Sequence, residues 1–203
     1  MKIDNLEADE LFHLGVQASQ EGDFDKAAAF FKRAGRISPG VDISYMLGVA
    51  YAGAGMKELA VCEMQDAIAQ DAEAWHIYLH IAVIKLQLQH DDAKDFLYPI
   101  AKLPADNYLG ESARGIMAMI DFELAIAKQF LTNAIALNTV NEPLNQNLNN
   151  MLAQVEAKLL LTDAADNGIK HWCSMRFALV DKQLSNEHPW KAIGIVNLLV
   201  FIE

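Results

Sequence analysis

Apolar residues near the start of the chain recur at the three- and four-residue spacing of an amphipathic helix. They form two stripes, the first with Leu11, Leu14 and Ala18, the second with Ala27, Phe30, Phe31 and Ala34. The polar stretch EGDF, at residues 21–24, separates the stripes and has the composition of a tight turn. The pattern therefore predicts two short helices joined by a turn.

The same pattern recurs along the chain with a fixed period. Four columns of residues step by 33, then 34, then 33 positions. The columns are Gly15, Gly48, Ala82 and Gly115; Ala27, Ala60, Lys94 and Ala127; Phe31, Met64, Tyr98 and Leu131; and Ala34, Ala67, Ala101 and Ala134. A shared period of this size predicts a solenoid of helical hairpins.

The small residues of these columns have a physical role. Two helices that cross closely have no room for a side chain larger than alanine. The ring of Phe31 is then expected to fill the space between neighbouring hairpins. The third unit departs from the pattern, because Lys94 stands in a small-residue column and Pro99 should kink or shorten the second helix.

At these positions the chain resembles the tetratricopeptide repeat family, whose 34-residue unit is a helix–turn–helix. The matching residues are Leu14, Gly15, Ala27, Phe31, Ala34 and Pro39, then Leu47, Gly48, Tyr51, Ala60 and Ala67, then Gly115, Ala127, Leu131 and Ala134. The resemblance implies an all-α fold, a right-handed superhelical α-solenoid. Its four repeats would cover about residues 8–40, 41–74, 75–107 and 108–141.

Residues 142–203 lie beyond these repeats, and the repeat register is expected to end at residue 141. The segment reads as a capping helix followed by an apolar helical tail. The capping helix would bury Leu144, Leu148, Met151, Val155 and Leu159, and a second stripe would carry Cys173, Phe177, Val180 and Leu184. The DNG stretch at 166–168 is expected to break the chain, and the final apolar run at 192–202 fits either a helix or a strand.

Charge and composition exclude several classes of protein. The net charge of −11 argues against binding to nucleic acid or to anionic membranes. The first twelve residues contain no signal-peptide run, and the apolar run at 192–202 is too short to span a bilayer. Two cysteines, Cys62 and Cys173, are too few for a disulfide framework. We expect a cytoplasmic protein with reduced thiols and no membrane insertion.

The sequence contains no recognisable catalytic constellation. His76 and His80 have the i, i+4 spacing of a metal-binding pair, but no further cysteine or histidine stands at ligand spacing. Glycine-rich phosphate loops are also absent from the sequence, and neither cysteine has a basic neighbour that would activate it. We therefore expect no enzyme activity, no cofactor and no metal site.

The resemblance also implies where a partner would bind, because the first helix of each tetratricopeptide unit lines a concave groove. The residues that match the groove positions are Phe12, Val16, Tyr45, Val49, His76, Leu79, Val83, Leu86, Ile116 and Met119. Co-chaperones of this family that hold acidic C-termini carry Lys, Arg and Asn there, so the resemblance does not extend to them. The groove residues instead suit a protein or peptide with apolar anchors.

Three interpretations of these apolar residues stay open at this stage. The first is a chaperone- or adaptor-like binding module, and the chain resembles the small translocator chaperones of type III secretion in size, acidity and apolar groove. The second is a self-associating structural subunit, a homodimer for example, whose C-terminal tail mates with a groove or with an end of the stack. In the third, the residues are core, covered by the chain's own C-terminal helices.

Overall fold

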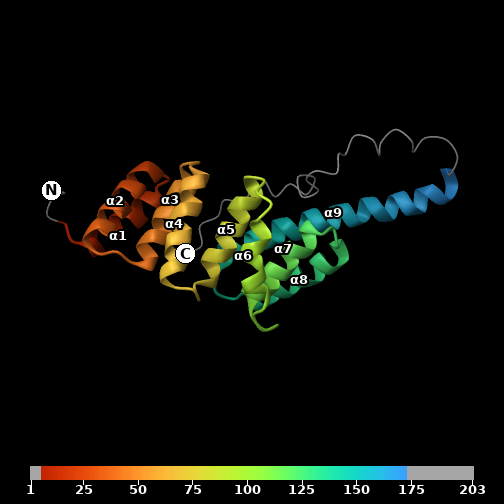
Figure 1. Cartoon of the computed structure of the whole chain (residues 1–203). Helices are drawn as coiled ribbons and strands as arrows, with labels where there is room; N and C mark the ends of the chain where they lie inside the picture. The colour runs from red at the N-terminus through yellow and green to blue at the C-terminus, as the bar shows by residue number, and fades with distance from the viewer. Residues whose placement is uncertain (1–5, 173–203) are drawn as a thin grey trace. The chain divides into compact units, whose positions relative to one another are not determined.

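The computed structural model describes the backbone of residues 6–172 and the side chains of residues 6–162. Within that range the chain forms helices and no strand (Figure 1). The helices are α1 (Ala8–Gln20), α2 (Phe24–Ile37), α3 (Val41–Gly53), α4 (Lys57–Gln70), α5 (Trp75–Gln87), α6 (Ala93–Ala101), α7 (Tyr108–Ile120), α8 (Leu124–Leu137) and α9 (Glu142–Trp172). Among these described helices, none combines the length and the apolar character needed to cross a membrane.

The chain divides into two compact units, Met1–Phe96 and Leu97–Glu203, and the boundary falls inside α6. In the first unit, each helix from α1 to α5 packs against the next one along the chain. In the second unit, α7 packs on α8 and α8 packs on α9. Because each helix contacts mainly its sequence neighbours, as a solenoid requires, the all-α solenoid predicted from the sequence is confirmed.

The small and the large columns of the repeat meet inside the first, second and fourth hairpins. A Cβ atom added to Gly15 would lie 2.6 Å from Cε1 of Phe31, which is closer than any side chain tolerates. A Cβ atom added to Gly48 would lie 2.7 Å from Cγ of Met64, and one added to Gly115 would lie 2.9 Å from Cδ2 of Leu131. Phe31 therefore fills its own hairpin, which corrects the expectation that it fills the space between neighbouring hairpins.

All four connections between a first helix and its second helix use the same turn. In the first, the amide of Gly22 donates to the Ser19 carbonyl at 3.0 Å, and that of Asp23 donates to the Ala18 carbonyl at 2.9 Å. These bonds define a Schellman motif, whose penultimate residue has a positive φ. The four residues there are Gly22 (79°), Gly55 (81°), Gln89 (65°) and Phe122 (60°), again 33, 34 and 33 positions apart.

Phe122 is the least suitable of these four residues, because a bulky side chain is strained at a positive φ. We expect Phe122→Gly to raise the free energy of unfolding by about 1 kcal/mol. The ring is 42% exposed, so its replacement removes little packing. Urea unfolding measures the change, with Gly55→Phe as the reciprocal variant that should destabilise. A destabilised Phe122→Gly protein would show that the ring contributes more by packing than its backbone strain costs.

Helix α6 is short and rotated relative to the expected register. It spans nine residues, against 14 in α2, and Pro99 lies within it, as predicted from the sequence. Its fully buried side chains belong to Ala93, Leu97 and Ile100, while Tyr98 is 49% exposed. The columns assigned to Lys94, Tyr98 and Ala101 are therefore wrong by one residue, because a lysine ammonium does not fit a closed small-residue position.

The connection between α8 and α9 is built from asparagine side chains. The Asn138 amide nitrogen donates to the Asn141 carbonyl at 2.7 Å and to Oδ1 of Asn145 at 3.0 Å. Oδ1 of Asn141 accepts from the Leu144 amide at 2.9 Å and so caps the start of α9. Asn141 is only 6% exposed, so this connection is largely closed to solvent.

Helix α9 keeps the repeat register at its start. It begins at Glu142, one repeat period after the start of α7 at Tyr108, and buries Leu144, Leu148 and Met151. The expected end of the register at residue 141 is therefore wrong for these first turns. The backbone also stays helical through 166–168 to Trp172, so the expected break there is absent. The predictions for Cys173 to Leu184 and for 192–202 concern residues outside the described part of the chain.

Candidate functional site

The ten predicted groove residues fall in both units. Eight belong to α1, α3 and α5 of the first unit, and two, Ile116 and Met119, belong to α7 of the second. Ile116 and Met119 are 1% and 0% exposed, so they present no surface to a partner in this structure. The candidate surface therefore lies in the first unit.

Within the first unit the predicted residues differ in exposure. Leu79 and Leu86 are each 2% exposed, and Val83 is 6% exposed. Phe12, Val16 and His76 are partly exposed, whereas Tyr45 and Val49 are 6% and 7% exposed. We call the face formed by Phe12, Val16, Tyr45, Val49 and His76 the first-helix face. Its accessible members are Phe12, Val16 and His76.

An aromatic cluster ties α3 to α5 at this face. The Tyr45 and His76 rings meet edge to face, with centroids 5.0 Å apart, and the Tyr45 hydroxyl lies 3.2 Å from Nδ1 of His80. His80 is partly buried. Sequence reasoning placed His80 in a possible metal pair and missed this contact, although its i, i+4 spacing from His76 was visible.

Burial sets the protonation of this cluster. Burial raises the pKa of the Tyr45 phenol, so the hydroxyl keeps its proton, and it shares a hydrogen bond with Nδ1 of His80. Burial also lowers the pKa of His76, and the nearby Asp42 and Asp71 carboxylates oppose that shift. Because the fold favours the neutral His76 ring, it loses stability as the pH falls below 6.5, the ordinary histidine value. At neutral pH the Tyr45 phenol and the His76 ring are therefore uncharged.

The two histidines do not form part of a larger metal-ligand set. Among the described residues, no group of three or more His, Cys, Asp or Glu side chains is arranged to hold a metal ion. Cys62, the described cysteine, is exposed and forms no disulfide. The chemistry that the first-helix face offers is apolar and aromatic contact.

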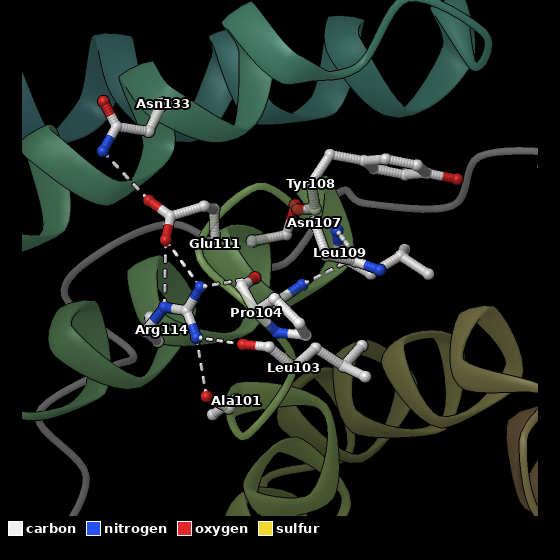
Figure 2. Close-up of polar contacts among 11 residues, drawn as sticks. Ala101, Leu103, Pro104, Asn107, Tyr108, Leu109, Glu111, Arg114 and Asn133 are labelled. Carbon is white, nitrogen blue, oxygen red and sulfur yellow. Dashed lines mark hydrogen bonds and ion pairs between the residues drawn. The ribbon is translucent and has the colours of Figure 1, made fainter.

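A polar network around Glu111 and Arg114 lies in the second unit and has a structural role (Figure 2). Glu111 is 3% exposed, and its Oε1 accepts from Nη2 and Nε of Arg114 at 2.6 and 3.1 Å. Oε2 of Glu111 accepts from Asn133 at 3.0 Å. Arg114 also donates to the carbonyls of Ala101 at 2.7 Å and Leu103 at 3.0 Å. The Glu111 carboxylate and the Arg114 guanidinium are thus both engaged within the protein.

The sequence contained a signal for this network that was not used. Arg114 occupies a column whose other members are apolar and follow the same repeat period. That column is Leu14, Leu47, Ile81, Arg114 and Leu148. A charge in an otherwise apolar column marks a position where the packing changes. Here the guanidinium bonds the last residue of the short α6 and the backbone just after it.

A second buried cation lies in the first unit. Lys85 is 6% exposed, and its Nζ lies 2.6 Å from Oδ2 of Asp92 and 5.1 Å from the centre of the Phe96 ring. The ion pair joins the end of α5 to the segment that precedes α6. It stabilises the irregular third hairpin and lies outside the first-helix face.

Comparison with known proteins supports the fold and gives no family by sequence. No family model matches the chain, and no curated protein sequence matches it. Among solved structures, MamA from Desulfovibrio magneticus RS-1 (residues 41 to the end) is similar with a TM-score of 0.58 and 15% identity, covering 82% of this chain and 91% of that one. A MamA RS-1 double mutant gives 0.57 and 15%, covering 82% and 90%. SycD, the translocator chaperone of Yersinia enterocolitica, gives only 0.41 and 18%, covering 77% and 90%.

Proposed function

We propose that this chain is a non-catalytic protein-binding module of the tetratricopeptide repeat type. Its first-helix face would bind an apolar segment of a partner protein. The observation that carries the proposal is that Phe12, Val16 and His76 stay partly exposed on these helices, with the His76 ring packed against Tyr45. The helical-repeat fold shared with MamA supports it, because such folds present the first helices of successive units side by side.

The charges beside the face favour an apolar partner over an acidic one. Asp9 and Asp42 stand exposed on α1 and α3, one at the start of each helix. Acidic peptides would be repelled there, and the chain as a whole carries a net charge of −11. Large aliphatic or aromatic anchors lower the free energy of the complex when they leave water, so they can bind without a basic cluster.

A peptide-library selection with the full chain tests this function. We expect selected peptides to be rich in Leu, Ile, Val and Phe. The double variant Val16→Asp/His76→Asp should weaken their binding about tenfold or more, because it places two carboxylates on the apolar face. The affinity should change little up to about 0.3 M salt, since charge contributes little to it.

The matched control carries the same two charges elsewhere in the first unit. Ala29→Asp/Gln65→Asp places them at exposed positions on α2 and α4, and should leave peptide binding unchanged. The proposal fails if acidic peptides are selected, if moderate salt abolishes binding, or if both double variants weaken it equally.

A further inference from the structure

Helix α9 extends well beyond the helix that supports it. Its antiparallel packing on α8 is fixed at one end by the asparagine connection and further along by Lys128, whose Nζ lies 2.7 Å from Oε1 of Glu156. Lys128 lies near the start of α8 at Leu124, whereas α9 continues from Glu156 to Trp172. At 1.5 Å per residue, this continuation spans about 24 Å. Figure 1 shows α9 continuing past α7 and α8.

The side of α9 that faces away from α8 changes character along the helix. Leu144, Leu148, Met151 and Val155 form the side that is buried, with 5% exposure or less. The opposite side begins with the exposed polar residues Gln146, Asn149 and Asn150, and continues with Ala153, Ala157, Leu160 and Leu161. We call these last four residues the open stripe. Leu160 and Leu161 are 69% and 70% exposed, which is unfavourable for two neighbouring large aliphatic side chains.

The open stripe has the composition of a helix-packing surface. Ala153, Ala157 and Leu160 follow the i, i+4, i+7 spacing of one helix face. Two alanines one turn apart allow a second helix to approach closely, as Gly15 allows Phe31 to approach in the first hairpin. The stripe therefore suits an apolar helix or an extended apolar segment.

We infer that the open stripe is the docking site of the chain's own C-terminal segment, residues 173–203. The described part of α9 ends at Trp172, about 17 Å along the helix from Leu161. The segment that follows is long enough to return over that distance. Its sequence supplies the apolar partners, with Cys173, Phe177, Val180 and Leu184 at helical spacing and a further apolar run at 192–202.

Charge distinguishes this occupant from a second copy of the chain. Residues 173–203 contain three basic and three acidic side chains, so the segment has no net charge. A second copy would instead bring a net charge of −11 to a protein that carries the same charge. The chain's own segment also has the advantage of covalent attachment, which gives it a high effective concentration at the stripe.

Trypsin susceptibility of the full-length protein tests the inference, because docking should protect the bonds after Arg176, Lys182 and Lys191. We expect Leu160→Asp/Leu161→Asp to increase cleavage at these bonds about tenfold or more, since cleavage follows the population of the undocked segment. The milder Leu160→Ser/Leu161→Ser variant should give a smaller increase. Mass spectrometry identifies the bonds, and hydrogen exchange of α9 verifies that the helix remains folded.

The control variant Gln146→Asp/Asn150→Asp adds the same charges to the polar part of the same helix side and should leave cleavage unchanged.

Sedimentation at several concentrations supplies the second measurement. Equal cleavage of both leucine variants and the unsubstituted protein overturns the inference. So does a leucine variant that converts a dimer to a monomer, since a second copy would then be the occupant. Neither result bears on peptide binding at the first-helix face, which is a separate proposal.

Discussion

Replacing Arg114 with leucine is expected to lower the free energy of unfolding by about 3–5 kcal/mol. The substitution leaves the Glu111 carboxylate buried without its cation, although the Asn133 side chain still donates to it. It also removes the donor to the carbonyls of Ala101, the last residue of the short α6, and of Leu103 just after it. Urea unfolding followed by circular dichroism measures the loss.

Two further variants separate the buried charge from simple loss of the side chain. Arg114→Leu/Glu111→Gln should be less destabilised than Arg114→Leu alone, because leucine matches Leu47 and Leu148 in the same column and the glutamine carries no charge. Arg36→Ala, at an exposed position of α2, should change the stability by less than about 0.5 kcal/mol. If the double variant were no more stable than the single one, the buried carboxylate would not be the source of the loss.

Replacing Phe31 with alanine is expected to cost about 3–5 kcal/mol of stability, because it empties the centre of the first hairpin. The ring is 0% exposed, packs over Gly15 and lies 5.6 Å from the Phe12 ring between centroids. Chemical unfolding of the full chain measures the cost.

The chain itself provides the matched control for this prediction. Leu131 and Met64 occupy the position of Phe31 in α8 and α4, each against a glycine. Phe31→Leu should therefore cost less than about 1.5 kcal/mol, since most of the volume is kept. If leucine and alanine proved equally costly, the loss would reflect the aromatic ring rather than the filled volume.

Much of the fold was predictable because its determinants are local. Helix pairs, their turns and the 33- or 34-residue period all follow from residues within one unit. Gly15, Gly48 and Gly115 were identified as crossing points from spacing, and the structure places each against the large residue of its own hairpin. Pro99 likewise predicted a short α6 because it lacks a backbone donor.

The candidate site was predictable only in outline. The resemblance to tetratricopeptide repeats pointed to Tyr45 and His76, which do meet across α3 and α5. The hydrogen bond between Tyr45 and His80 joins residues 35 positions apart, so no local pattern reveals it. Exposure was equally hidden, because Leu79 on α5 and Met119 on α7 have the same apolar character as an accessible groove residue yet are buried.

The sequence by itself determined which segments are helices, where they turn and which small residues sit at crossings, because these depend on short-range periodicity and backbone sterics. Only the tertiary structure decided that α6 rotates to bury Ala93 in place of Lys94, and that Arg114 neutralises Glu111. It also decided that the register continues into α9 and that Leu160 and Leu161 remain exposed there. These outcomes depend on which surfaces meet, and on the cost of burying a charge or exposing a hydrocarbon, which a single helix does not specify.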